Sequence, residues 1–344
     1  MQKLNSMVLL LLFSFLANAE QSYQAPLVKE SLLLDLAATD IAVAVGERGH
    51  VLIKSSADDF TQVTVPTTTT LTAVTLVEQQ IWAVGHDATI LHSADAGNTW
   101  QVQMSAPEME RPFLDVLFFD SQHGVAIGAY GLFYRTLDGG NSWLAERHAE
   151  FLDPYDREYL EQVRLEDEEF YQQELNSILP HLNRVRRIDE NTLLLAGEAG
   201  LLAKSTDKGK TWERLNVDYT GSFFDVVQLN SNIMVAAGLR GNVFVSDDGE
   251  QWDYVNTCSA ATVNSIIERD DAVYFIGNNG VKVKAKLPMA TSTYDPYAAP
   301  VNCEPAAGIS VSQTQSKSAL LNAAMINGQL FVTAADGIYS LSLD

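Results

Sequence analysis

The chain has 344 residues, of which 44 are Asp or Glu and 22 are Lys or Arg, so its formal charge is −22. That charge excludes proteins that bind nucleic-acid phosphates or dock on anionic membranes, since both need a dense basic surface. A hydrophobic content of 47% excludes wholesale disorder, and two cysteines are too few for a disulfide scaffold or a four-cysteine zinc site.

The N-terminus has the pattern of a secretory signal peptide. Lys3 precedes an apolar run from Met7 to Leu16, and small residues follow up to Ala19. The run is shorter than the roughly 20 residues of a membrane-spanning helix, and no cysteine follows it for lipid attachment. We therefore predict a signal peptide over residues 1–19, cleaved after Ala19. The mature chain is expected to be periplasmic or otherwise exported, without direct membrane insertion.

One phrase recurs along the mature chain: a short apolar strand, a Gly, two variable residues and usually a second Gly. The first Gly of each copy falls at positions 46, 85, 128, 197, 238 and 277, and a degenerate copy lies near 334. Four of the six intervals are 39 to 43 residues, and a period near 40 is typical of a β-propeller. We predict an all-β fold, a single seven-bladed propeller of four-stranded blades over 20–344. The segment 23–29 is predicted to supply the outer strand of blade 7 and close the ring.

A second phrase, S-x-D-x-G-x-T-W, follows the first in the middle repeats. It is complete at 93–100 and 205–212, nearly complete at 136–143, and lacks both hydroxyl positions at 245–252. This is the Asp box of sialidase-type propellers, in which Asp binds backbone N–H groups, Gly takes a positive φ and Trp packs between blades. A catalytic or calcium-binding role would not be repeated around a ring, so a structural role is favoured. The residues assigned to these boxes are Asp95, Gly97, Trp100, Asp138, Gly140, Trp143, Asp207, Gly209, Trp212, Asp247, Gly249 and Trp252.

The larger of two insertions, 146–180, is predicted to lie between blades 3 and 4. Its apolar residues recur at helical spacing among many acidic residues, between a cap at Asp153 and a stop at Pro180. This pattern predicts one amphipathic helix of roughly 20 to 25 residues. The helix either docks on the rim with a solvated acidic face or presents a partner-binding surface. The basic residues that follow are expected to offset its charge: Arg184, Arg186 and Arg187.

The second insertion, 287–317, is rich in Pro, Ala, Ser and Thr and carries Cys303. In an oxidising compartment Cys303 either pairs with Cys258 or remains a free thiol. A disulfide is favoured, because it would tether an otherwise loose loop.

The parity of antiparallel strands places the G-x-x-G loops and the insertions between blades on one face, and the Asp boxes on the opposite face. Loops that ring a channel mouth usually hold the ligand site. We predict that the variable loop residues and the helical insertion contact a partner. The predicted residues are Arg48, His86, Asp87, Tyr130, Tyr159, Phe170, Glu198, Arg240, Asn278 and Asn279.

No catalytic residue, metal site or cofactor is predicted. Glycoside hydrolysis needs a carboxylate pair, and sialic acid recognition needs an arginine triad, whereas only Arg48 and Arg240 fall in the G-x-x-G loops. The six histidines show no metal-binding spacing. The chain is therefore expected not to be an enzyme. The alternative is a carbohydrate-active propeller that uses loop carboxylates such as Asp87 and Glu198, and a third hypothesis is a plain structural or adhesion module.

Repeats of A-V/I-G-x-x-G followed by S-x-D-x-G-x-T-W, in a secreted propeller, resemble the photosystem II assembly and stability factor family. The resemblance covers nearly the whole mature chain, Gln21 to Asp344, and suggests a bacterial relative. It implies a non-enzymatic scaffold that binds assembly intermediates of membrane proteins. We therefore expect a monomer with a protein partner, a membrane protein or an assembly intermediate, and no nucleic acid.

Overall fold

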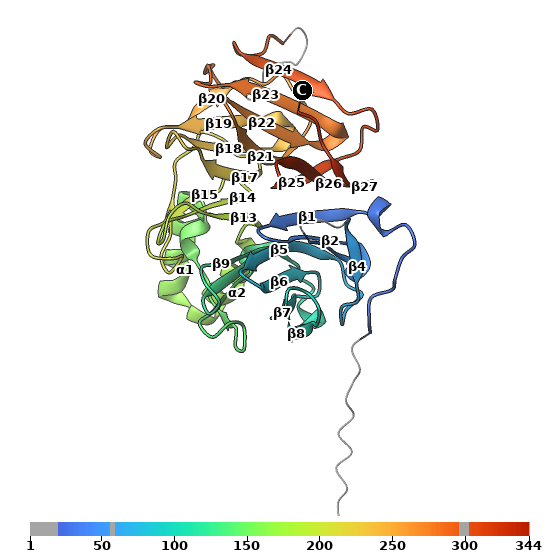
Figure 1. Ribbon diagram of the computed structural model, residues 1–344. Helices are drawn as coiled ribbons and strands as arrows, with labels where there is room; N and C mark the ends of the chain where they lie inside the picture. The colour runs from blue at the N-terminus through green and yellow to red at the C-terminus, as the bar shows by residue number, and fades with distance from the viewer. Residues whose placement is uncertain (1–19, 56–58, 296–302, 344) are drawn as a thin grey trace, which may run out of the picture.

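Seven antiparallel sheets surround a central axis in the computed structural model, which describes residues 20–55, 59–295 and 303–343 (Figure 1). The predicted seven-bladed propeller is confirmed. The predicted signal peptide and its cleavage after Ala19 lie outside the described residues.

Each of the first six blades is a four-stranded sheet in chain order, and the first strands of successive blades lie side by side around the axis. Blades 1 to 3 comprise β1 (Leu33–Ala38), β2 (Ala42–Gly46), β3 (Val51–Lys54) and β4 (Thr61–Val63); β5 (Leu71–Val77), β6 (Gln80–Gly85), β7 (Thr89–Ser93) and β8 (Gln101–Met104); and β9 (Phe113–Phe118), β10 (Gly124–Gly128), β11 (Phe133–Thr136) and β12 (Leu144–Ala145). Blades 4 to 6 comprise β13 (Leu182–Arg187), β14 (Leu193–Gly197), β15 (Leu202–Ser205) and β16 (Glu213–Arg214); β17 (Phe223–Gln228), β18 (Met234–Gly238), β19 (Val243–Ser246) and β20 (Asp253–Val255); and β21 (Val263–Arg269), β22 (Ala272–Gly277), β23 (Val281–Lys286) and β24 (Ile309–Gln313).

The second strand of each blade is packed on both faces by the neighbouring blades, which explains its unbroken apolar sequence. Every residue of β2, β10, β14 and β18 is buried. The Gly that ends each strand marks a close approach between backbones. A Cβ on Gly46 would lie 2.2 Å from the carbonyl oxygen of Leu32, so this position admits no side chain.

The innermost strand of every blade contains a β-bulge at the same place. In blade 1, Leu33 pairs with Gly46 and Asp35 with Val45, so that one residue between them is extra. The same shift occurs in the other six blades. A bulge redirects the side chain beside it. In every blade except blade 2, where Ala73 stands, the residue that follows the bulge belongs to a polar belt around the axis that is described below.

Blade 7 corrects one prediction, because its sheet has only the three strands β25 (Leu320–Ile326), β26 (Gln329–Ala334) and β27 (Gly337–Ser340) in the described chain. The segment 23–29 does not supply a fourth strand. It runs beside blade 1, where Ser22 N–H donates to Val65 O at 2.8 Å and Ala25 N–H donates to Gln62 Oε1 at 2.8 Å. Pro26 has no N–H for a strand ladder, and the chain then forms a 3-10 turn over Val28–Glu30 that contacts β27.

The helical insertion corrects a second prediction, since it forms two helices rather than one. These are α1 (Pro154–Glu166) and α2 (Glu168–Ile178), which lie beside blades 3 and 4 (Figure 1). Asp167 breaks the pattern with extended dihedral angles, φ −153° and ψ 102°, and its carboxylate accepts a hydrogen bond from Phe170 N–H at 3.0 Å. Asp is a good N-cap, so its side chain begins a second helix where periodicity alone predicted continuation.

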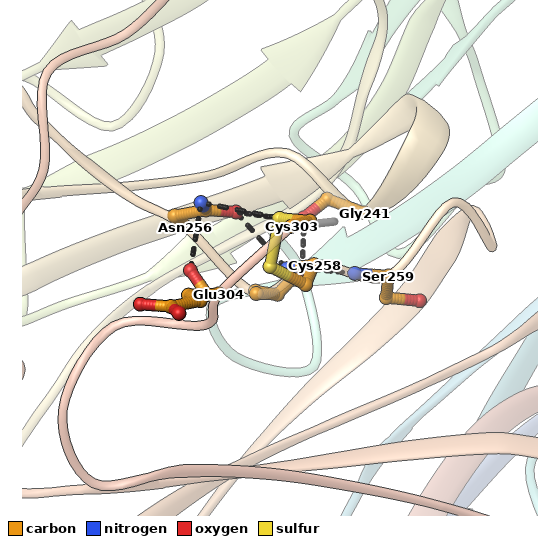
Figure 2. The surroundings of a disulfide bond; sticks show 7 residues. Gly241, Asn256, Cys258, Ser259, Cys303 and Glu304 are labelled. Carbon is orange, nitrogen blue, oxygen red and sulfur yellow. Dashed lines mark hydrogen bonds between the residues drawn. A yellow bond between two sulfur atoms is a disulfide. The ribbon is translucent and has the colours of Figure 1, made fainter. Parts of the chain in front are cut away.

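The second insertion is joined to the end of blade 5 by a disulfide between Cys258 and Cys303 (Figure 2). Asn256 lies against this bond. Its side-chain oxygen accepts from Cys258 N–H at 3.0 Å, and its amide nitrogen donates to Glu304 O at 3.2 Å. The disulfide therefore fixes the insertion to the connection that leaves blade 5.

Candidate functional site

The G-x-x-G loops are rigid turns that all lie on one face of the propeller. They join the second and third strands of their blades, so strand parity places them together. The residue before the second Gly takes a positive φ in each of six blades, although in none of them is it a glycine: Arg48, Asp87, Tyr130, Ala199, Arg240 and Asn279 have φ between 53° and 57°. This costly conformation makes each turn project its variable side chain in an equivalent direction.

Tyr130 is the large aromatic residue among these turn positions, and 46% of it is exposed. Its ring meets the ring of His181 edge to face at 4.6 Å, and the guanidinium of Arg111 lies 5.3 Å from its centroid. His181 in turn lies 3.4 Å from the carboxylate of Glu198. Two predicted residues, Tyr130 and Glu198, are thus brought together through His181, and we call these four residues the Tyr130 cluster.

The helical insertion is anchored directly on the Tyr130 cluster. Gly131 N–H donates to Pro180 O at 2.9 Å, and Arg111 donates to Asn176 O at 3.0 Å. A Cβ on Gly131 would lie 2.5 Å from Leu179, so the end of α2 packs tightly on the blade 3 turn. Arg111, His181 and Asn176 were not predicted, because they lie outside the repeated phrase and join the site only through the fold.

The two predicted helical residues lie half exposed on the insertion, Tyr159 at 46% and Phe170 at 44%. Leu160, Tyr171 and Leu175 are buried and dock the helices on the propeller. The insertion thus combines a docked inner surface with exposed aromatic side chains on an acidic outer surface.

Arg48 lies apart from the Tyr130 cluster, beside a cavity of about 460 Å³ that Tyr23 and His50 also line. His50 is buried, and its Nδ1 has no hydrogen-bond partner in the described part of the chain. Burial lowers the pKa of His50, against the carboxylate of Glu47, which raises it.

The remaining predicted residues are distributed around the same face. Arg240 lies near Tyr219, whose pKa burial raises to about 12 although Asn242 and the Arg240 charge oppose this. Asn278 accepts a side-chain hydrogen bond from Asn264 at 3.0 Å, and the carbonyl of Asn279 accepts one from Gln313 at 2.6 Å. The last two, His86 and Asp87, form the turn of blade 2.

On the opposite face, the Asp-box carboxylates bind their own turns. Asp207 accepts from Thr211 N–H at 2.9 Å and from the Thr211 hydroxyl at 2.7 Å, and Asp95 and Asp138 make the equivalent bonds. Burial opposes ionisation of Asp207, but the hydrogen bonds from Thr211 lower its pKa to about 2. Two of the glycines contact the preceding blade, since a Cβ would lie 2.0 Å from Ile53 on Gly97 and 1.9 Å from Gln103 Oε1 on Gly140.

The blade 5 box differs from its prediction by one residue. Asp248, not Asp247, accepts the turn hydrogen bonds, at 2.7 Å from Glu250 N–H and 2.9 Å from Gln251 N–H. A hydroxyl is also present, because Gly249 N–H donates to Ser246 Oγ at 2.8 Å. The box is one residue shorter between its hydroxyl and its Gly, so alignment on Gly249 and Trp252 selected the wrong Asp.

A buried polar belt crosses the central channel. Asp35, Asp115 and Asp225 follow the bulges of blades 1, 3 and 5, and each carboxylate accepts the backbone N–H of the next blade's inner strand at 2.8 to 2.9 Å. Arg184 on blade 4 lies 3.6 Å from Asp35 and 3.5 Å from Asp115, so it joins opposite sides of the ring. The belt comprises Asp35, Asp115, Arg184, Arg186, Asp225, Ser265 and Asn322.

The arginines that were expected to offset the charge of the acidic helices have their carboxylate partners elsewhere. Arg184 lies largely buried in the belt, and Arg186 makes two hydrogen bonds of 3.0 Å to Asp225. Arg187 donates to the carbonyls of Phe119 and Asp189. These side chains follow an inner strand, so strand geometry rather than chain proximity decides their partners.

Asp115 gives the belt a pH dependence. Burial raises the pKa of this carboxyl to about 6, although Arg184 opposes the shift. The folded pKa exceeds the unfolded value of about 3.9, so the folded chain holds an extra proton between pH 4 and 6. Relative to Asp115→Asn, the wild-type free energy of unfolding is expected to fall by about 2 kcal/mol from pH 4 to pH 7. Urea unfolding of both proteins across this range checks it, and parallel stability curves would contradict it.

Within residues 20–55, 59–295 and 303–343, no helix is long and apolar enough to cross a membrane. In the same residues no three His, Cys, Asp or Glu side chains converge as a metal-ligand set.

Comparison with known proteins shows which propellers this chain resembles. A family model described as photosynthesis system II assembly factor YCF48 matches residues 47–131. The photosystem II assembly lipoprotein Ycf48 of Prochlorococcus marinus is 25% identical over 215 residues, 55% of this chain and 61% of that protein. The chain is a seven-bladed β-propeller that is similar, over part of its length, to photosystem II assembly factors. A second Ycf48 lipoprotein, from Synechococcus sp. strain CC9902, is 29% identical over 47% of this propeller and 42% of its own length.

The aligned regions span about three fifths or less of these relatives. A solved structure titled "YCF48 bound to D1 peptide" matches 93% of this chain and 94% of its own chain, with a TM-score of 0.63 and 15% identity. That likeness supports the propeller architecture. The relatives are named as assembly factors rather than as enzymes.

Proposed function

We propose that this chain is a non-enzymatic, exported scaffold that binds a segment of a membrane or exported protein during assembly. The binding surface is the face of the propeller that carries the G-x-x-G turns, which we call the turn face. The Tyr130 cluster and the helical insertion are its main elements. The chain acts as a monomer on a protein partner and uses no cofactor.

The observation that carries this proposal is a half-exposed tyrosine on a rigid support. Tyr130 is held by Arg111 and His181 and by the packing of Leu179 on the adjoining Gly131. Tyr and Arg are the side chains that most often dominate the energy of protein interfaces, and a preformed anchor loses little entropy on binding.

The relatives support a protein partner of this kind. Two are named photosystem II assembly lipoproteins, and one solved propeller of the same architecture is titled as bound to a D1 peptide. A peptide segment of a membrane protein is therefore the ligand class that we propose for the turn face. The carbohydrate-active alternative is not pursued, since its loop carboxylates lie on the turns of different blades, Asp87 on blade 2 and Glu198 on blade 4, and Glu198 accepts a hydrogen bond from His181 N–H at 3.2 Å.

Capture of a client from detergent-solubilised envelope membranes tests the proposal. Tyr130→Ala is expected to reduce capture about tenfold or more, as for an interface anchor. Met325→Ala is the matched control, because Met325 is also 46% exposed but lies at the far end of an inner strand, away from the turn face. Equal capture by the two variants would contradict the proposal.

A further inference from the structure

A second cavity of interest lies at the rim, between the outer parts of blades 4 and 5. It has a volume of about 590 Å³ and is lined by residues of β19 and β20, of the connection that enters blade 5 and of the second insertion. The second insertion, which lies within blade 6 between β23 and β24, forms one wall, where Ser292 N–H donates to Tyr254 O at 2.7 Å and extends the edge of β20. We call this cavity the rim pocket and define it by Asp218, Phe244, Trp252, Asp253, Tyr254 and Tyr294.

Aromatic rings converge in the rim pocket from three separate segments. The ring of Tyr294 lies 5.0 Å from that of Tyr254 and 5.4 Å from that of Phe244, at interplanar angles of 60° and 66°. Phe244 and Tyr254 lie 5.5 Å apart. The indole of Trp252 is fixed by a hydrogen bond of 3.3 Å to Gly249 O. Phe244 is buried in the core, whereas Trp252, Tyr254 and Tyr294 are partly exposed, and their rings form the aromatic wall of the cavity.

Two carboxylates give the rim pocket a negative charge. Asp218 and Asp253 are exposed, and neither makes an ion pair within the described residues. The electrostatic field of the acidic residues acts on the rings. Burial raises the pKa of Tyr294, and the negative charges of Asp218 and Asp295 raise it further. Asp218 and Asp253, beside the ring faces of a chain of charge −22, attract a cation.

We propose that the rim pocket binds a cationic side chain, arginine or lysine, presented by a basic segment of a partner protein. Aromatic faces carry negative charge density, and cages of them recognise guanidinium and ammonium groups. The pocket is larger than one side chain, so residues flanking the cation also find room. A net charge of −22 disfavours approach to an anionic lipid surface, and this favours a peptide over a membrane as the source of the cation.

The disulfide holds this pocket together. Tyr294 belongs to the insertion that Cys303 ties to Cys258, just beyond β20. Tyr254 and Tyr294 lie on the two segments that this bond joins, so the oxidised bond limits how far the two rings can separate. This binding site is separate from the turn face, and its test does not depend on the proposed client.

Calorimetry on the chain from residue 20 to 344 provides the test. The probe is an acetylated, amidated Gly-Ser-Arg-Arg-Gly-Ser peptide, and its control has citrulline, a neutral isostere, in place of arginine. We expect the arginyl peptide to bind about tenfold more tightly than the citrulline peptide. Tyr294→Leu, which removes a ring face but keeps an apolar side chain, is expected to lose about the same factor.

Asp218→Asn is a second variant that keeps the packing, and it is expected to weaken binding several-fold at low salt. Asp40→Asn is its control, since Asp40 is an exposed residue in the turn between β1 and β2. Equal affinity for the two peptides, or equal effects of Asp218→Asn and Asp40→Asn, would overturn the proposal. Binding to phosphatidylcholine vesicles that Tyr294→Leu abolishes, without binding to the arginyl peptide, would also overturn it in favour of a lipid headgroup.

Discussion

Replacing Arg184 with methionine is expected to lower the free energy of unfolding by about 3 to 5 kcal/mol. Arg184 is the cation between Asp35 and Asp115, at 3.6 and 3.5 Å, and both carboxylates are almost fully buried. Methionine preserves much of the volume but leaves the two acids facing each other without a counter-ion. Urea unfolding followed by tryptophan fluorescence measures the loss.

Arg187→Met provides the matched control for this prediction. Arg187 lies on the same strand but is exposed and donates only to the carbonyls of Asp189 and Phe119. Its replacement is expected to cost less than about 1 kcal/mol. Adding Asp115→Asn to Arg184→Met removes one buried charge and is expected to restore part of the stability, by the logic of a double-mutant cycle. Equal stability of Arg184→Met and Arg187→Met would contradict the belt's role.

Removing the disulfide by the double change Cys258→Ser and Cys303→Ser is expected to cost about 4 kcal/mol. The bond closes a loop of 45 residues, and that chain-entropy restriction on the unfolded state is lost with it. Two backbone hydrogen bonds also hold the insertion, one from Ala306 N–H to Asn256 O and one from Ser292 N–H to Tyr254 O. The blades are therefore expected to remain folded without the disulfide. Denaturant unfolding in the absence of reductant measures the difference.

The single variant Cys258→Ser and reduced wild-type protein are the controls. Both should have the same denaturant midpoint of unfolding as the double variant, since all three proteins lack the same disulfide bond. Limited proteolysis should then cut the insertion faster than the blades. A loss below about 1 kcal/mol in all three would show that the disulfide does not restrain the unfolded chain.

The repeated phrases were sufficient to predict the blades, because each blade encodes its own strands and turns. The fully apolar second strand and its terminal Gly are local patterns with a period near 40. The break at Asp167 was missed because helical periodicity continues across it, whereas the cap depends on one hydrogen bond to Phe170. The prediction that segment 23–29 forms the fourth strand of blade 7 was wrong, because Pro26 lacks the N–H that a strand ladder needs there.

The belt could be predicted only in part. Its signal is an acidic residue between apolar neighbours in three inner strands, at Asp35, Asp115 and Asp225. Its pairing is not local, since Asn322 meets Asp35 from 287 residues away. The Tyr130 cluster is similar: Tyr130 follows from the repeat, but Arg111 and His181 reach it from connections between blades that have no repeated pattern.

Site-specific photo-crosslinking in living cells tests the scaffold function most directly. A photoreactive residue replaces Tyr130 on the turn face, and in a parallel strain it replaces Met325 away from that face. The account predicts one discrete membrane or exported protein crosslinked at position 130 and absent from position 325, as read by mass spectrometry. Solvent-quenched product alone at position 130, or the same adducts at both positions, would contradict it.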